Sequence, residues 1–451
     1  MKIARDILES PAYRGAEAIV RRLRDRDFET YIVGGAPRDL LLGAWPSDYD
    51  IATRARPRQV RALFEKTIPV GEAFGVVIVR VEGRNYEVAT FRADGEYLDG
   101  RRPTRVHFSA PREDALRRDF TVNALMFDPV AHKIIDFVGG RRDLRERRIR
   151  AVGDPDARFA EDHLRLIRAV RFAARLDFRI ERKTRAAIRR LAPRVNDVAA
   201  ERIGDELVKI LTGPRAGRAV RLLSETGLLA HVLPEIEVMR GVEQPPNFHP
   251  EGDVFVHTCR MLDLARSPSP ALALGLLLHD VGKPPTQRFA PDRIRFDRHC
   301  EVGAEMAVRI CRRLRRPRAL TERVEFLVAN HLRVKEAPDM RPARMKRFMR
   351  HEGFAELLEL FRLDSLASHR KMEAYKRCRR IWEELPPEQI SPPPLLTGND
   401  LIAMGYRPGP IFGEILTAIE TAQLEGEIAT PDEARERVRR DFPLPSHGEK
   451  Q

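Results

Sequence analysis

The chain has 451 residues, of which 43% are hydrophobic and 33% charged, and this predicts a soluble globular protein of roughly two to four domains. Lys and Arg outnumber Asp and Glu by 81 to 67, so the net charge of +14 favours a polyanionic partner, nucleic acid before an anionic membrane. The longest apolar run, 271–278, is too short to span a bilayer, and four cysteines without a CxxC spacing exclude a disulfide framework and fit a reducing cytoplasm.

Strand and helix signals divide the chain into an α/β part and a helical part. Short β-type runs alternate with helical ones up to about residue 140, and the runs 76–81 and 86–91 flank a glycine-containing turn, as in a hairpin. Beyond Arg141, apolar residues recur mainly at helical spacing, and stretches rich in Pro and Gly interrupt the helices. The expected domains are an α/β head at 1–140, a helical neck and body at 141–240, an all-α domain at 241–390 and a helical tail at 391–451.

The stretch "YIVGGAPRDLLLG" predicts a strand, a glycine turn and a helix. Gly34 and Gly35 would let the backbone approach a ligand closely, and free N–H groups at the start of a helix favour anions. Arg38 could add a fork-shaped pair of donors to a phosphate oxygen.

Two aspartates follow in "SDYDIAT". In a strand, Asp48 and Asp50 would point to the same side, because side chains alternate. Two carboxylates so placed can hold Mg²⁺ ions roughly 3.5 to 4 Å apart, an arrangement that serves phosphoryl transfer. An ordinary turn and a solvated strand end are the alternatives for each motif alone, but the combination favours a phosphate and metal site.

Five local patterns then agree in order with one known family: "GGAPRD…DYD", "RRDFTVNAL", "DFVGGRRDL", "EDHLRLIR" and "ERIGDELVKIL". The chain resembles the class II nucleotidyltransferases of the DNA polymerase β superfamily, the group of bacterial CCA-adding enzymes and poly(A) polymerases. The resemblance implies an α+β fold, with a polymerase β-like head followed by an all-α neck and body. Glu87 is the candidate third carboxylate of the catalytic site, and a surface strand glutamate is the alternative.

By the same resemblance, "RRDFTVNAL" contacts the ribose and phosphates of a nucleoside triphosphate. Its side chains offer suitable donors and acceptors, although without the family it would be interpreted as a charged helix start. The candidate residues are Arg117, Arg118, Asp119 and Asn123.

"EDHLRLIR" is the candidate base-reading motif. On a helix, Asp162 and Arg165 would share one face, and an acceptor beside a donor matches the pairing edges of cytosine and adenine. Guanine and uracil place a carbonyl where the amino group should be, so they would be rejected. A surface ion pair is the alternative, but the family resemblance favours base reading, with Arg168 as a positioning residue.

The second half contains a further candidate metal site in "FVHTCRM", "LLLHDVGK" and "LDSLASH". These segments resemble the HD phosphohydrolase superfamily, an all-helical fold that binds Mg²⁺ or divalent transition metals. The resemblance makes His299 and His331 candidate ligands of a second metal or of phosphate, and Lys283 a candidate phosphate contact. The primary candidate ligands are His257, His279, Asp280 and Asp364.

Together these patterns predict template-independent addition of CCA to the 3′ end of tRNA from CTP and ATP. A polar loop at 92–109 resembles the flexible loop of CCA- and A-adding enzymes, so incorporation of A is expected. An A-adding enzyme, a poly(A) polymerase and a hydrolase whose head only binds RNA remain the alternatives. Phosphatase or 2′,3′-cyclic phosphodiesterase activity in tRNA end repair is the expected role of the HD domain.

Overall fold

The computed structural model describes residues 3–69, 75–94, 106–245, 252–291 and 293–444. The chain forms two compact units. Unit 1 comprises Met1–Glu237 with Arg313–Arg315, and unit 2 comprises Val238–Arg312 and Arg316–Gln451. The polar loop expected near the head falls largely on 95–105, outside the described residues.

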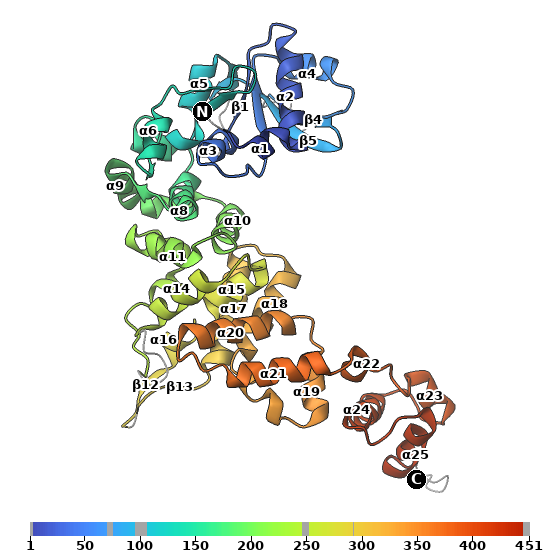
Figure 1. Cartoon of the computed structure of the whole chain (residues 1–451). Coiled ribbons are helices and arrows are strands. Elements are labelled where there is room, and N and C mark those ends of the chain that lie inside the picture. Colours follow the sequence, from blue (N-terminus) through green and yellow to red (C-terminus); the bar gives the residue numbers. More distant parts are fainter. Residues whose placement is uncertain (1–2, 70–74, 95–105, 246–251, 292, 445–451) are drawn as a thin grey trace. The chain divides into compact units, whose positions relative to one another are not determined.

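A seven-stranded sheet forms the centre of the head in unit 1, in the order β3-β4-β5-β2-β1-β8-β9 (Figure 1). Its neighbouring strands are antiparallel except for β2 and β5, which run parallel. The strands are β1 (Thr30–Val33), β2 (Asp50–Thr53), β3 (Thr67–Ile68), β4 (Val76–Val81), β5 (Arg84–Thr90), β8 (Met126–Asp128) and β9 (Lys133–Ile135). A separate pair is formed by β6 (Arg92–Asp94) and β7 (Val106–Phe108).

The expected hairpin is confirmed. Strands β4 and β5 pair from Val76 to Val81, and the two residues between them, Glu82 and Gly83, both have positive φ. Positive φ at both positions is the conformation of a type I′ turn, whose twist matches that of the flanking strands. The hairpin places β5 directly beside β2, the strand that carries the candidate metal ligands.

Helices cover the sheet because their apolar positions recur with helical spacing. Helix α2 begins after Ser10, whose side chain accepts the N–H of Tyr13, and its buried face includes Ile19 and Leu23. Helices α2 and α4 both pack against strands of the sheet. The helices of the head are α1 (Arg5–Glu9), α2 (Pro11–Arg24), α3 (Gly35–Leu41), α4 (Pro57–Leu63), α5 (Pro111–Leu116) and α6 (Gly140–Arg145).

The rest of unit 1 is mainly helical, as expected, but it is not entirely so. Two short parallel strands, β10 (Arg148–Ile149) and β11 (Arg179–Ile180), bring the start of this part against the end of α8. The helices are α7 (Pro155–Glu161), α8 (Leu164–Leu176), α9 (Arg182–Leu191), α10 (Ala200–Leu211), α11 (Ala216–Glu225), α12 (Leu229–Val232) and α13 (Pro234–Glu237).

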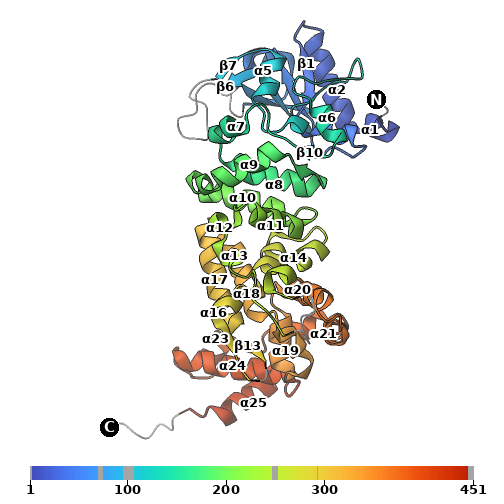
Figure 2. The same ribbon diagram turned by 90° about the vertical axis from the view of Figure 1, so that its left-hand side faces the viewer.

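Unit 2 is built around α15 (Pro270–Leu278), whose residues 271–278 are all buried. A helix that is apolar on every side belongs in a core, and α14, α18 and α20 pack against it (α15 is labelled in Figure 1, and the other three helices in both Figure 1 and Figure 2). The other helices of this core are α14 (Val254–Leu264), α16 (Lys283–Thr286), α17 (His299–Arg313), α18 (Arg318–Asn330), α19 (Pro342–Met349), α20 (Phe354–Ala367) and α21 (Glu373–Glu384).

The expectation of an all-α domain here is wrong in one place. Strands β12 (Gln287–Phe289) and β13 (Ile294–Phe296) form an antiparallel hairpin between α16 and α17. Only "IRF" alternates apolar and polar residues as a strand does, and each run is too short for such a signal to stand out from the helical sequence around it.

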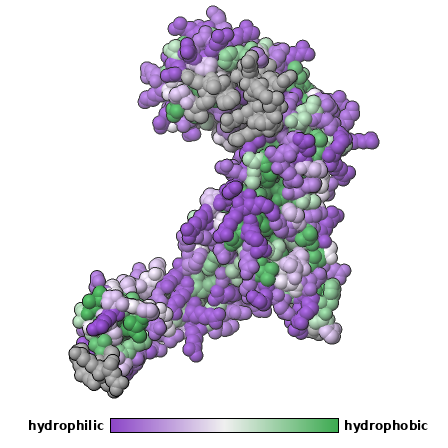
Figure 3. Space-filling view, turned by 180° about the vertical axis from the view of Figure 1, so that it is seen from behind, coloured by the Kyte–Doolittle hydropathy of each residue, from purple (hydrophilic) through white to green (hydrophobic). Residues whose placement is uncertain are grey.

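The C-terminal helices have a hydrophobic core of their own, which includes Leu401, Ile415 and Val438. They are α23 (Gly398–Ala403), α24 (Pro410–Glu425) and α25 (Pro431–Asp441), and the short α22 (Pro387–Ile390), which has no buried residue, precedes them. Hydrophilic residues cover most of the face shown in Figure 3, in keeping with the high charge of the chain. In the part of the chain that the structure describes, no helix combines the length and apolar character needed to cross a bilayer.

Candidate functional site

A cleft of about 500 Å³ in unit 1 brings together most of the residues expected to act in the head. Every predicted nucleotide-binding residue lines it, together with Asp48 and Asp50, whereas Glu87 does not. Arginines outnumber aspartates in its wall, as suits a ligand with several phosphates. The lining residues are Gly34, Gly35, Arg38, Ser47, Asp48, Asp50, Arg117, Arg118, Asp119, Asn123, Asp162, Leu164, Arg165, Arg168, Arg171, Phe172, Arg175 and Arg202.

The glycine turn and the acidic strand lie against each other. Strands β1 and β2 pair with Val33 opposite Asp50, and Gly34 follows directly. Gly34 has φ +75°, and a Cβ on it would lie 2.7 Å from Asp50 Oδ2. Only glycine therefore fits here, because its lack of a side chain allows both the backbone angle and the close approach.

Asp48, Asp50 and Glu87 form the acidic cluster of the head, in which the charges of Asp48 and Glu87 act on Asp50. Asp50 begins β2, and Asp48 lies in the irregular segment just before it, so the expectation that both belong to the strand is wrong for Asp48. The parallel register of Ile51 with Val88 places Glu87 of β5 beside Asp50. Burial, with the neighbouring charges of Asp48 and Glu87, raises the pKa of Asp50 to about 6. A site where carboxylates repel one another suits a divalent cation.

A series of hydrogen bonds connects α3, the helix after the glycine turn, to α8, the helix that carries the candidate base-reading residue Arg165. Arg38 is buried and donates to both carboxylate oxygens of Asp39, at 2.7 and 3.0 Å, and to Asn123 Oδ1 at 2.6 Å. Arg38 thus lines the cleft, as expected, but its guanidinium is already engaged in holding Asn123. Asn123 in turn donates to Asp119 Oδ1 at 3.2 Å.

The last residue of this series of hydrogen bonds, Arg168, lies on α8. Arg168 donates to Asp119 Oδ2 through Nε at 3.0 Å and Nη2 at 2.7 Å. Burial alone would raise the pKa of Asp119, but the charge and hydrogen bonds of Arg168 lower it, so this carboxylate is ionised. An ionised buried pair of this kind fixes the position of α8 relative to the ribose motif.

Asp114 orients the two candidate phosphate ligands of the ribose motif. It is buried, and its carboxylate accepts from Arg117 Nη2 at 2.6 Å and Arg118 Nη2 at 3.0 Å. Burial would raise the pKa of Asp114, but Arg118 and Arg117 lower it. Sequence reasoning missed Asp114, although its spacing of three and four residues from the arginines on a helix end was the available signal.

The expected helix over Asp162 and Arg165 is broken. Helix α7 ends at Glu161 and α8 begins at Leu164, with Asp162 extended between them. The cause is local, because Asp162 Oδ1 accepts the N–H of Leu164 at 3.1 Å and so competes with a continuous helix. Both candidate base-reading residues nevertheless line the cleft.

Asp162 and Arg165 each have a partner other than the one expected. Arg202 of α10 donates to Asp162 Oδ2 at 2.7 Å, and Arg165 donates to the carbonyl of Arg158 at 2.9 Å and pairs with Glu161. The alternative of an ion pair between Asp162 and Arg165 is therefore not what the structure shows. Arg202 belongs to "ERIGDELVKIL", so its motif was recognised, but its role needs the fold, because the two residues are far apart in sequence.

Unit 2 contains a second cluster, at the predicted histidine–aspartate site. His257 on α14 lies with its Nε2 3.1 Å from Asp364 Oδ1 on α20. His279 follows α15, and its Nε2 lies 3.1 Å from Asp280 Oδ2. The donor atoms of His257, His279 and Asp364 lie within 4.8 Å of one another, so these residues could hold a metal ion.

The two further histidines complete this cluster around Asp280. Asp280 Oδ1 lies 3.7 Å from His299 Nε2 and 3.8 Å from His331 Nε2. Burial lowers the pKa of His299, and burial together with the charge of His279 lowers that of His331 to about 3. Both imidazoles are therefore neutral at physiological pH, which is the form that binds metals.

Backbone carbonyls fix the orientation of three of the rings. The Nδ1 atoms of His279, His299 and His331 lie 3.0, 2.7 and 2.8 Å from the carbonyls of residues 276, 296 and 328. A carbonyl partner requires the proton on Nδ1 and leaves the Nε2 lone pair for a ligand, as in proteins that bind metals through histidine. The donor set and its orientation thus fit divalent cations.

Lys283 lies at the edge of the same site. Its Nζ donates to Asp280 Oδ2 at 2.7 Å and to Gln244 Oε1 at 2.6 Å. A cleft of about 310 Å³ beside it is lined by His299, Arg293 and Arg295 among others. Gln244 and the hairpin arginines were not identified from the sequence, because they come from segments without a recognisable motif.

Three family models match the chain. "Poly A polymerase head domain" matches residues 30–150. "Probable RNA and SrmB- binding site of polymerase A" matches 177–239. "tRNA nucleotidyltransferase domain 2 putative" matches 299–436. The matches therefore cover the head, much of the helical part of unit 1 and most of unit 2.

Two relatives and one solved structure are similar to the chain and point to the same family as these models. The chain is 48% identical over 223 residues to a CCA-adding enzyme of Geobacillus thermodenitrificans, a match that covers 49% of this chain and only 55%, about half, of that relative. It is 34% identical over 430 residues to a CCA-adding enzyme of Geobacillus sp. (strain WCH70), covering 94% of this chain and 95% of the relative. The crystal structure of a Bacillus stearothermophilus CCA-adding enzyme in complex with CTP is similar over 96% of this chain and 99% of that one, with 30% identity and a TM-score of 0.75.

Proposed function

Because the chain belongs to the family of bacterial CCA-adding enzymes, we propose that it adds CCA to the 3′ end of tRNA in the cytoplasm, taking CTP and ATP as substrates. The single observation that supports this most directly is the cleft of unit 1, which is lined by the glycine turn, by Asp48 and Asp50 and by the candidate base-reading residues. We also propose the four-part division into a head at 1–140, a neck and body at 141–240, an HD domain at 241–390 and a tail at 391–451.

The reaction needs the triphosphate and the 3′ hydroxyl of tRNA to meet at the acidic cluster. Gly34 and Gly35 offer backbone N–H groups to the phosphates, and Arg117 and Arg118, held by Asp114, offer charged donors. Mg²⁺ held by Asp48 and Asp50, with Glu87 beside them, would activate the attacking hydroxyl and stabilise charge on the phosphates. Attack in line on the α-phosphate then forms the new phosphodiester bond and releases pyrophosphate.

Base choice follows from the hydrogen-bonding groups of α8 and its N-terminus. Asp162 presents an acceptor and Arg165 a donor, a pair that matches the amino group and ring nitrogen of cytosine or adenine. Guanine or uracil would place a carbonyl oxygen against the Asp162 carboxylate. Leaving such buried groups unpaired costs about 1–3 kcal/mol each, so the wrong nucleotides are rejected without a nucleic-acid template.

One incorporation assay distinguishes this function from its rivals. The protein is incubated with tRNA that lacks CCA, with tRNA that ends in CC and with an unstructured RNA, each with single nucleoside triphosphates. We expect addition of C to the first and of A to the second. Addition of A to the CC-ending tRNA alone would show an A-adding enzyme, and extension of the unstructured RNA by A would show a poly(A) polymerase.

The cluster of unit 2 supports a second activity, the hydrolysis of phosphate esters such as a 2′,3′-cyclic phosphate at an RNA end. Divalent cations held by its histidines and aspartates would activate a water molecule and stabilise charge on the phosphate. Lys283 and the arginines of the neighbouring cleft would orient the phosphate group.

This activity is tested with 2′,3′-cyclic AMP and p-nitrophenyl phosphate in the presence of Mg²⁺, Mn²⁺, Ni²⁺ or Zn²⁺. We expect turnover with at least one cation and its loss in His279→Ala, with retention in His231→Ala, a histidine of unit 1. An equal rate in both variants would contradict the assignment of the site.

A further inference from the structure

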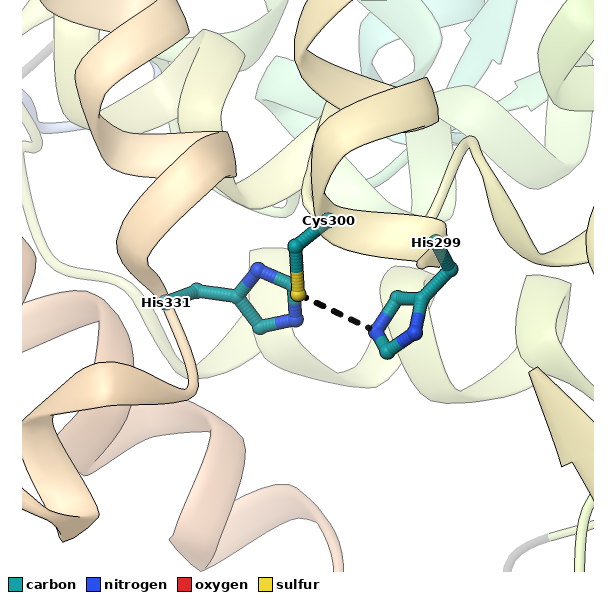
Figure 4. Close-up of side chains that lie close together, drawn as sticks. All are labelled: His299, Cys300 and His331. Carbon is teal, nitrogen blue, oxygen red and sulfur yellow. Dashed lines mark hydrogen bonds between the residues drawn. The ribbon is translucent and has the colours of Figure 1, made fainter. Parts of the chain in front are cut away.

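A cysteine lies directly beside the histidines at one end of the metal cluster in unit 2. Cys300 is the second residue of α17, next to His299, and its Sγ lies 3.6 Å from His299 Nε2 (Figure 4). The donor atoms of His299, Cys300 and His331 lie within 4.8 Å of one another. Three elements therefore converge here, because His331 comes from the end of α18 and Asp280 from the segment after α15.

The spacing of sulfur and nitrogen is that of a metal site. Zn²⁺ lies about 2.3 Å from a cysteine sulfur and about 2.0–2.1 Å from a histidine nitrogen, so tetrahedral geometry sets these two ligands about 3.5 Å apart. The observed distance of 3.6 Å fits that value with almost no movement. The two rings are already oriented by the carbonyls of Phe296 and Val328, which leaves both Nε2 atoms available to a cation.

The two ends of the cluster differ in chemistry. One end offers His257, His279 and the carboxylate of Asp364, whereas the other offers His299, His331 and a sulfur. Two imidazoles with a carboxylate accommodate Mn²⁺, Fe²⁺ or Zn²⁺, whereas a thiolate shifts the preference toward softer ions such as Zn²⁺. A thiol that only filled space would not need its sulfur turned toward an imidazole nitrogen.

We propose that His299, Cys300 and His331 form a thiophilic subsite that binds Zn²⁺ or a similar soft cation, distinct from the subsite of His257, His279 and Asp364. This inference rests on the proposed metal-dependent function of the cluster in unit 2. Cys300 is then the residue that makes the two subsites unequal. Binding releases the thiol proton, and the fourth position of the cation is left to Asp280, water or substrate.

The test uses the metal-free full-length protein and Co²⁺ as a spectroscopic probe for Zn²⁺. Thiolate bound to Co²⁺ gives an intense near-ultraviolet charge-transfer band, and imidazole or carboxylate ligands do not. We expect the wild type to develop this band, Cys300→Ser to lack it, and Zn²⁺ affinity in that variant to fall at least tenfold. The matched control is Cys311→Ser, because Cys311 is a buried free cysteine on the same helix, and it should retain both properties.

The binding of Mn²⁺, followed by electron paramagnetic resonance, separates this inference from the proposed function. Mn²⁺ binding that is unchanged in Cys300→Ser, together with loss of the cobalt band, supports an added soft subsite. Mn²⁺ binding without any band in the wild type would overturn the inference and leave the metal centre standing, with only a thiol–imidazole hydrogen bond at Cys300. If the wild type binds none of the three cations, both proposals fail.

Discussion

Asp50, a proposed metal ligand, lowers the stability of the metal-free fold at neutral pH. Burial and the charges of Asp48 and Glu87 raise its pKa from 3.8 to about 6. When the pKa of an acid is higher in the folded state than in the unfolded state, the free energy of unfolding falls as the pH rises between those two pKa values. At neutral pH the ionised Asp50 therefore destabilises the metal-free fold.

We accordingly expect Asp50→Asn to abolish nucleotide addition and to raise the free energy of unfolding by roughly 1–3 kcal/mol at neutral pH. Urea denaturation in the presence of EDTA measures this change. The difference should shrink as the pH falls through 6 toward 3.8, where the wild-type carboxyl is protonated. A variant that is less stable than the wild type at neutral pH would contradict the role given to the acidic cluster.

Arg202 is expected to act through Asp162. In Arg202→Ala the Asp162 carboxylate loses the donor that holds it at 2.7 Å, so the preference for CTP and ATP over UTP and GTP should fall by about 1–3 kcal/mol, roughly five- to 150-fold. Binding of the triphosphate should remain. Single-nucleotide incorporation rates measure the preference, and Asp162→Ala should lose the same preference.

Arg194→Ala provides the control, because Arg194 pairs with Asp197 on an exposed surface. It should leave base choice unchanged. If Arg202→Ala lowers the rate with all four nucleotides equally, Arg202 does not act through base reading.

At the scale of elements, the turn between β1 and α3 is the most constrained part of the head. Gly34→Ala would place a Cβ 2.7 Å from Asp50 Oδ2 at a residue with φ +75°. Displacing a catalytic group by about 1 Å costs on the order of a hundredfold in rate, so we expect at least that loss of nucleotide addition.

Gly43→Ala is a matched control for that variant. Gly43 also has positive φ, at +70°, but a Cβ there meets nothing within 4 Å. Gly43→Ala therefore tests a positive φ without the close contact, and only Gly34→Ala should lose activity. Equal activity in the two variants would show that the close contact with Asp50 is unimportant.

The glycine of "HDVGK" holds two elements of unit 2 together. A Cβ on Gly282 would lie 2.2 Å from the carbonyl oxygen of His299 and 2.7 Å from the backbone nitrogen of Gly303. Gly282→Ala should therefore push α17 away, and with it His299 and Cys300, and lower the melting temperature. Metal content measured after dialysis should fall. Gly413→Ala in α24, where a Cβ meets nothing within 4 Å, should change neither property.

The sequence predicted those elements whose signals are local. The hairpin of β4 and β5, the glycine turn before α3 and the helical periodicity beyond residue 141 were all confirmed. The break between α7 and α8 was missed, because a carboxylate that accepts a backbone N–H within two residues is compatible with either a helix or a cap. Strands β10 to β13 were missed because runs of two or three residues carry almost no periodicity.

The sequence identified the residues of the cleft but not all of their hydrogen-bond partners. Every predicted nucleotide-binding residue lines the cleft, since motifs place them by residue type and order. The bonds from Arg38 to Asn123, and from Arg202 to Asp162, join residues 85 and 40 positions apart. Such contacts are set by the packing of helices, for which one sequence offers no direct signal. The pairing of Cys300 with the histidines was missed although Cys300 adjoins His299 in the chain.

For the whole molecule, the two clusters should be chemically independent, because each is complete within its own unit. We expect Asp48→Ala to abolish nucleotide addition and to leave hydrolysis of 2′,3′-cyclic AMP unchanged, and His279→Ala to do the reverse. Parallel assays of both activities on both variants measure this. Loss of nucleotide addition in His279→Ala, with a melting temperature like that of the wild type, would contradict it.

The Arg202–Asp162 contact also limits how the proposed nucleotide specificity could be redesigned. A single substitution of Asp162 would leave Arg202 in the nucleotide site without its carboxylate partner. Variants designed to incorporate U or G would therefore need substitutions at both positions, which a scan of single substitutions would not find.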